Sequence, residues 1–112
     1  MRLHYWMMAS LLMLIAFLAL AWGKGDAAKG KTLFSRCAIC HGDSGEGKEA
    51  MAKALGVKIP VLASKEIQSL DDAALRKIIV EGKGKMQAVK LPDAEVEDVI
   101  AFMRSLKKPS PK

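Results

Sequence analysis

The sequence has only two cysteines and two histidines among its 112 residues, which limits the metal sites that it can build. A structural zinc site needs about four ligands. His4 lies inside an apolar N-terminal segment, and Cys40 and His41 are adjacent, which makes joint chelation of one tetrahedral ion awkward. A thioredoxin-like pair would need a βαβ context, and no strand-like alternation flanks the cysteines. A disulfide between the two cysteines is possible after export, but it would not explain the histidine that follows them.

Aromatic residues are also scarce, at 5% of the chain, and the basic residues are interleaved with acidic ones. Nucleic acid is therefore a disfavoured partner. The formal net charge of +6 is modest and indicates a protein partner with an acidic docking surface. The glycines between residues 42 and 47 are neither preceded by a strand nor followed by Gly-Lys-Ser/Thr, which argues against a phosphate-binding loop.

The chain does contain the run Cys37-Ala38-Ile39-Cys40-His41, which has the form of the attachment sequence for a c-type haem. Two thiols three positions apart lie on one side of a helical turn, where each can add to one vinyl group of a haem. His41 follows directly and can offer a ring nitrogen to the iron. The run therefore predicts one covalently bound haem c, held by Cys37 and Cys40, with His41 as an axial ligand. A chain this short also gains from an apolar cofactor in its core.

The N-terminus carries an apolar segment from about Tyr5 to Trp22, preceded by Arg2. Ala19-Leu20-Ala21 fits the small-x-small pattern of a signal-peptide cleavage site. About 18 helical residues also span roughly 27 Å, just enough to cross the hydrocarbon region of a membrane. The segment is thus either a signal peptide or an uncleaved anchor, and its marginal length favours cleavage.

These alternatives divide the chain into two parts. Residues 1–23 are expected to be a signal peptide or an N-terminal membrane anchor, with residues 3–22 as the possible tether. Residues 24–112 are expected to form one domain. Both alternatives predict export of this domain to the periplasm.

From residue 26 onward the chain has the pattern of short helices joined by glycine-rich loops, which predicts an all-α domain. The first helix begins after Asp26 and is expected to carry the Cys-x-x-Cys-His run at its end. The other expected helices cover residues 48–55, a segment from the N-cap Asp71 to about Gly82, and residues 93–106. The last helix has an apolar face expected to be buried, formed by Val96, Val99, Ile100, Phe102, Met103 and Leu106.

A haem iron bound by His41 needs a sixth ligand or is left open. Met51 and Met103 fall on apolar helical faces, where packing accounts for them. Met86 lies instead in a loop among lysines and glycines, with no apolar face to join. Its thioether is therefore predicted to be the second axial ligand.

In combination these features resemble a class I monohaem cytochrome c of the small bacterial type. The resemblance extends from Asp26 to Lys107. It rests on four stretches of this sequence, which are Gly30…Phe34…Cys37-Ala38-Ile39-Cys40-His41-Gly42, Lys58-Ile59-Pro60, Gly82-Lys83-Gly84-Lys85-Met86 and the helix Val99-Ile100-Ala101-Phe102-Met103-Arg104-Ser105-Leu106. The resemblance implies the cytochrome c fold, about four short helices wrapped around one covalently attached haem.

The resemblance also implies particular contacts. Gly30 and Phe34 would pack against the terminal helix near Val99 and Phe102. The carbonyl of Pro60 would accept a hydrogen bond from the far nitrogen of the ligating histidine and fix its tautomer. The sequence departs from the family at one position, since Gln87 stands where proline often follows the ligand methionine.

With two protein ligands on the iron, the expected function is electron transfer rather than catalysis. Two alternatives stay open. The chain could be the haem subunit of a larger membrane redox complex, or a gas-binding or peroxidatic protein with a labile sixth ligand, to which only Gln87 points. The expected docking face for redox partners surrounds Met86, where Lys83, Lys85 and Lys90 lie.

Overall fold

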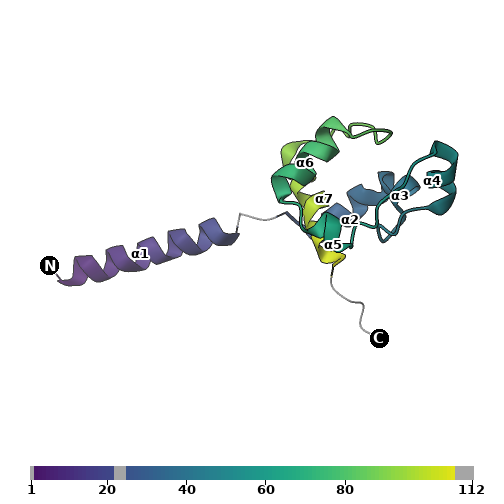
Figure 1. The fold of residues 1–112 in the computed structure, drawn as a ribbon. Helices are drawn as coiled ribbons and strands as arrows, with labels where there is room; N and C mark the ends of the chain where they lie inside the picture. The colour runs from purple at the N-terminus through teal and green to yellow at the C-terminus, as the bar shows by residue number, and fades with distance from the viewer. Residues whose placement is uncertain (1, 22–24, 108–112) are drawn as a thin grey trace.

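The computed structural model describes residues 2–21 and 25–107. Within these residues the chain forms seven α-helices and one 3-10 helix, and β-structure is limited to a single bridge between Lys83 and Met86. The all-α prediction is confirmed (Figure 1). The elements are α1 (Arg2–Ala21), α2 (Ala27–Leu33), η1 (Phe34–Arg36), α3 (Ala38–His41), α4 (Glu49–Leu55), α5 (Lys65–Gln68), α6 (Asp72–Glu81) and α7 (Asp93–Ser105).

Helix α1 extends away from the other helices, which gather into one body (Figure 1). Its large apolar side chains from Leu3 to Leu12 are exposed. Among the helices that the structure describes, none combines the length and apolar character needed to cross a membrane. Trp22, at the end of the predicted apolar segment, lies outside the described residues. The choice between signal peptide and anchor stays a prediction.

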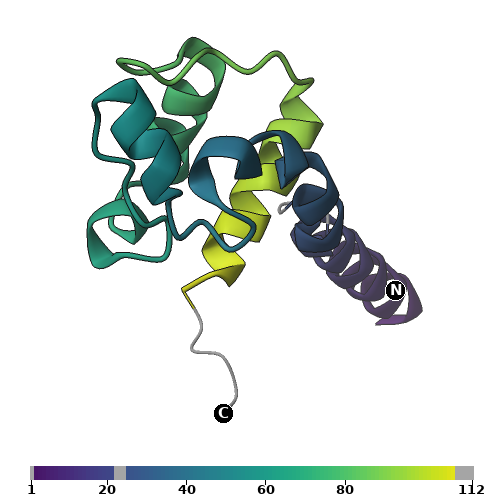
Figure 2. The same ribbon diagram turned by 90° about the vertical axis from the view of Figure 1, so that its right-hand side faces the viewer.

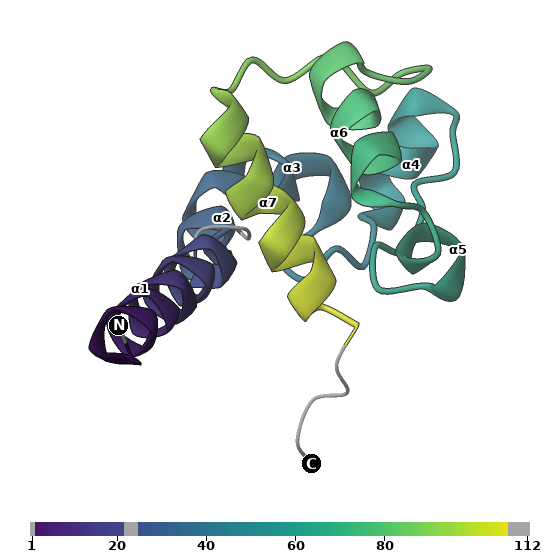
Figure 3. The same cartoon turned by 90° about the vertical axis from the view of Figure 1, so that its left-hand side faces the viewer.

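Helices α2 and α7 cross at close range (Figures 2 and 3). Asp26 caps α2 by accepting hydrogen bonds from the N–H groups of Ala28 and Lys29, as its sequence position predicted. Its own N–H donates to Asp98 Oδ1 of α7 over 2.7 Å. At the crossing, a Cβ on Gly30 would overlap the Asp98 carbonyl and lie 2.9 Å from the Cβ of Phe102. Only glycine allows the two backbones to approach this closely.

The Gly30→Ala variant is therefore expected to lose about 1–3 kcal/mol of unfolding free energy, because neither backbone can move away without disturbing the core. Denaturant unfolding of the haem-loaded protein measures this change. Lys31→Ala, at an exposed position of the same helix, is the matched control and should change stability by no more than about 0.5 kcal/mol. Equal stability of the two variants would mean that the crossing tolerates a side chain.

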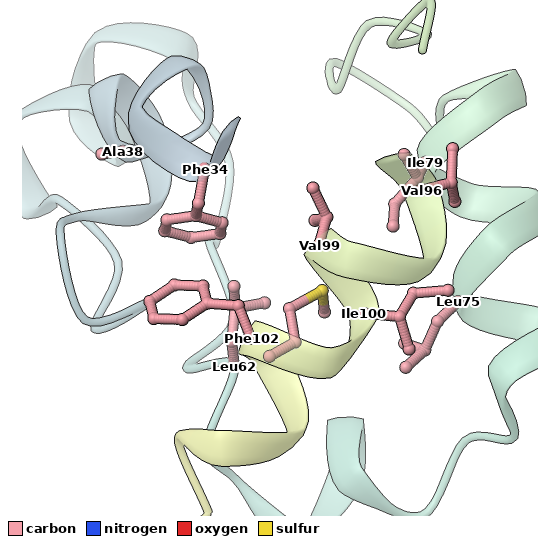
Figure 4. Close-up of a cluster of buried hydrophobic side chains, with 10 residues drawn as sticks. Phe34, Ala38, Leu62, Leu75, Ile79, Val96, Val99, Ile100 and Phe102 are labelled. Carbon is pink, nitrogen blue, oxygen red and sulfur yellow. The ribbon is translucent and has the colours of Figure 1, made fainter. Parts of the chain in front are cut away.

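The core lies between α7 and the elements around it, and Figure 4 shows its side chains. Five of the six apolar residues predicted on the last helix are buried, and Leu106 is half-buried. Phe34 of η1 faces Phe102 with ring centroids 5.0 Å apart and planes inclined by 57°, a tilted arrangement that aromatic pairs prefer. The predicted packing of Gly30 and Phe34 on the terminal helix is confirmed. The buried apolar side chains of the core are those of Phe34, Ala38, Leu62, Leu75, Ile79, Val96, Val99, Ile100, Phe102 and Met103.

Polar groups of α7 also hold α5 and α6 in place. Arg104 donates to Asp72 Oδ1 at 2.8 and 3.1 Å and to the carbonyls of Gln68 and Leu70 at 2.9 and 2.6 Å. These bonds satisfy carbonyls at the end of α5 that have no partner within the helix. The Gln68 amide in turn donates to the carbonyls of Leu62 and Met103. The end of α7 is thus tied to the start of α6 through one guanidinium.

Candidate functional site

The Cys-x-x-Cys-His run occupies a helical turn of its own, α3, and not the end of the first helix. Helix α2 stops at Leu33, η1 follows, and the Cys37 N–H donates to the Phe34 carbonyl at 2.8 Å. The expectation of one continuous helix is therefore wrong. Leu33, Phe34 and Cys37 all have right-handed helical backbone angles, so the chain continues in the same direction through the tighter 3-10 turn.

This local structure divides the run between two faces. Ala38 is buried in the core, whereas Ile39 is 62% exposed. Cys37, Cys40 and His41 are half-buried, and their spacing of three and four residues places them on one face of the turn. The local fold therefore presents two thiols and one imidazole together, which is the arrangement that the sequence predicted.

Both cysteines are free thiols, so the disulfide alternative is not realised. Within residues 2–21 and 25–107, no three histidine, cysteine or carboxylate side chains gather in a way that could hold a metal ion. Burial raises the pKa of the Cys37 thiol, an effect that the neighbouring Arg36 charge partly opposes.

His41 is the best supported ligand in this part of the structure. Burial lowers the pKa of its imidazole, which favours the neutral form that binds metals. The ring lies 6.4 Å from that of Phe34, centroid to centroid. Its Nδ1 is buried and has no hydrogen-bond partner. Backbone bonds from Gly47 N–H to the His41 carbonyl and from Lys48 N–H to the Cys40 carbonyl fix the end of the turn.

Pro60 lies in an irregular, half-buried segment that packs beside the loop after His41. The Leu62 N–H donates to the Gly45 carbonyl at 2.8 Å, and Gly47 leaves room for the Ile59 carbonyl. The hydrogen bond between His41 and Pro60 that the resemblance implies stays a prediction, and the Nδ1 that would donate it is buried with no partner in this structure. Packing, with the Phe34 ring alongside, orients the imidazole in this structure.

Met86 lies in a well-defined turn after α6 and is half-buried. Lys83 and Met86 exchange two backbone hydrogen bonds of 3.0 and 2.9 Å, and Gly84 between them has φ of 57°. Glycine at this position favours a tight hairpin turn, a signal that the sequence analysis did not use. The Val89 N–H donates to the Ile79 carbonyl at 2.8 Å and closes the base of the loop. The loop reaches toward the side where α3 and α4 lie (Figures 1 and 3).

The helical fold and the thiol–thiol–imidazole turn define a haem-binding electron-transfer domain. The family model described as Cytochrome c matches residues 27–107, and the chain belongs to this family. A thiosulfate dehydrogenase of Stutzerimonas stutzeri (strain A1501) is 33% identical over 97 residues, which are 78% of this chain and 29% of that protein. The chain thus spans less than a third of this relative's length.

Membership of the family means that the chain carries covalently bound haem c with its iron, and that its function is haem-based electron transfer. Cytochrome c domains are typically exported. The donor set fits this group, because two free thiols and a neutral imidazole share one face of α3. The buried Nδ1 of His41 is free to donate the hydrogen bond that the second nitrogen of a ligating histidine usually makes.

Proposed function

We propose that this protein is an electron carrier with one haem c, attached through Cys37 and Cys40 and ligated by His41 and Met86. The observation that carries the proposal is the shared face of the two thiols and the imidazole on α3. When bound, the haem supplies one-electron chemistry through its Fe(II) and Fe(III) states.

Each residue of the site has a separate task in this proposal. Each thiol would add its sulfur to one carbon of a haem vinyl group and its hydrogen to the other, so that a C–S bond would replace a C–C π bond without net oxidation. The neutral imidazole of His41 offers Nε2 to the iron. Pro60, whose segment packs beside the loop after His41, is proposed to accept from the Nδ1 that now has no partner.

Met86 would complete the site with a thioether from the opposite loop. A methionine ligand favours the reduced state and raises the reduction potential relative to a second histidine. Two protein ligands also leave no coordination position for a substrate, which favours a carrier over a catalyst. The hydrogen bonds of the Lys83–Met86 turn support this role because they restrict the loop despite Gln87.

Visible spectra and a redox titration of the purified, haem-loaded protein test the proposal. We expect six-coordinate, low-spin spectra in both oxidation states and a reversible one-electron transition. Rapid binding of carbon monoxide or peroxide by the native protein would instead support the gas-binding or peroxidatic alternative.

The similarity to part of a longer thiosulfate dehydrogenase favours one second candidate, a haem-bearing component of a larger redox enzyme. In that case the electrons would come from oxidation of a small sulfur oxoanion by an associated catalytic unit. The native mass of the protein, extracted in mild detergent from the cells that make it, separates the candidates. A monomer supports the carrier, and a stable complex with reductase or dehydrogenase activity supports the component.

We further propose that the N-terminal segment exports the domain to the periplasm, as a cleaved signal peptide or as a tether. The helical, exposed character of residues 2–12 agrees with either role. The N-terminal sequence of the mature protein decides between them.

A further inference from the structure

A groove of about 620 Å³ lies outside the site just described, between α6 and the segment that leads into α7. We call it the Val80 groove. Val80 is 37% exposed on one wall, Val89 and Leu91 are half-buried on the other, and Pro92 is exposed. The remaining lining residues are Arg76, Lys90 and Asp93. Four apolar and three charged residues therefore line the groove.

The charge around the groove has one dominant sign. Residues 82–92 include Lys83, Lys85 and Lys90, all exposed, and no acidic residue. Arg76 forms ion pairs with Asp93 at 3.2 Å and with Glu97, and the hydrogen bond that it donates to Glu97 raises the pKa of its guanidinium. Its charge is thus compensated, whereas the three lysines have no ion pair among the residues that the structure describes. Lys90 thus brings a free positive charge to the groove lining, and Lys83 and Lys85 add two more in the loop that leads to Val89.

The groove lies at the base of the loop that carries Met86. The hydrogen bond between Val89 N–H and the Ile79 carbonyl joins the two ends of this loop, and Val80 and Val89 line the groove from those two ends. The same segment continues from the loop to the start of α7 (Figure 3). A molecule seated in the groove would contact both ends of the loop at once.

We propose that the Val80 groove binds an apolar side chain of a redox-partner protein whose surrounding surface is acidic. The inference rests on the proposed electron-carrier function. Electron-transfer complexes are small and transient, and one apolar anchor inside a ring of complementary charges suits such an interface. A second copy of this chain is a poorer occupant, because the lysines of two facing segments would repel each other.

Synthetic peptides provide a probe that needs no identified partner. One heptapeptide has three acidic residues on each side of a central leucine, and the matched peptide has alanine in place of leucine. Amide chemical-shift changes in the isotope-labelled, haem-loaded protein report where each peptide binds and how tightly. We expect the leucine peptide to shift Val80, Val89 and Leu91 and to bind about fivefold to tenfold more tightly than the alanine peptide.

In the Val80→Asp variant, the leucine peptide is expected to bind no more tightly than the alanine peptide. Val61→Asp, at a site 47% exposed and away from the groove lining, makes the same charge change and should keep that advantage. Added salt should weaken the binding of both peptides, because it screens their charges. The ratio of the two affinities should stay nearly constant, because the contribution of the leucine side chain is not electrostatic.

Three results would overturn the proposal. They are equal binding of the two peptides, shift changes centred away from residues 80–92, and identical behaviour of the two aspartate variants. If the protein bound the peptides as expected but lacked a haem spectrum, the proposed function would fail while the groove remained a binding site. Concentration-dependent dimerisation through the same residues would show that a second copy is the occupant instead.

Discussion

Replacing Met86 with alanine is expected to lower the reduction potential by on the order of 0.1 V or more, within the roughly 0.8 V range that axial ligands command. The physical reason is the loss of the thioether, which favours the reduced state. The change should leave the fold intact, because Met86 is outside the buried core and the Lys83–Met86 turn is held by backbone atoms. A spectroelectrochemical titration measures the potential, and the near-infrared charge-transfer band reports the thioether bond directly.

Met51→Ala is the matched control for this experiment. Met51 is half-buried on α4, and the sequence assigns it to packing. Its removal should leave both the potential and the near-infrared band nearly unchanged. If the Met86 variant kept the near-infrared band and the Met51 variant lost it, the axial ligand would be Met51. The loop that carries Met86 would then have no role in ligation.

Replacing Phe102 with alanine is expected to remove about 3–5 kcal/mol of unfolding free energy, a large part of the roughly 5–15 kcal/mol that stabilises a small domain. Phe102 is buried, and its ring packs against Phe34 beside the crossing at Gly30. The truncation leaves a cavity between α2 and α7 that neither backbone can close. Guanidinium unfolding of the haem-loaded protein, followed by circular dichroism, measures the loss.

Val61→Ala serves as the control, because Val61 is largely exposed and its truncation should cost less than about 1 kcal/mol. A double-mutant cycle with Phe34→Ala tests the pair itself. The two aromatic truncations should be non-additive, with a coupling of about 0.5–1.5 kcal/mol. An unfolding midpoint for Phe102→Ala that matches the parent protein would contradict the packing in Figure 4.

Much of the fold could be predicted because the signals were local. Asp26 and Asp71 cap α2 and α6 as their positions indicated, and the periodic face of α7 is buried as expected. The close approach at Gly30 was also predictable, since a small residue on an apolar helix face marks such crossings. The resemblance to cytochromes c added the pairing of Phe34 with α7.

Other features depend on the whole structure and were missed. Helix α2 ends at Leu33, before the first cysteine, and η1 connects it to α3. Phe34 of η1 and Ala38 of α3 both enter the core. Helix α5 is a single turn, and only its N-cap Ser64 could have indicated it. The hydrogen bonds of Arg104 could not be predicted from sequence, because their partners come from segments more than thirty positions away.

In the candidate site, too, some features follow from the local sequence and others depend on the whole structure. The spacing of Cys37, Cys40 and His41 alone predicts their shared face, since one helical turn fixes it. The hydrogen bond to Pro60 was implied by the resemblance only and stays a prediction. The role of Met86 depends on how a loop approaches the opposite side of a haem, which stays a prediction.

The central claim is that Cys37 and Cys40 hold a haem covalently. Mass spectrometry of the intact, denatured protein after acid–organic extraction tests it most directly. The account predicts a polypeptide heavier than its sequence by one haem, and haem-bearing peptides that contain both cysteines after proteolysis. A polypeptide stripped to its bare mass, with all haem in the organic phase, would contradict the account.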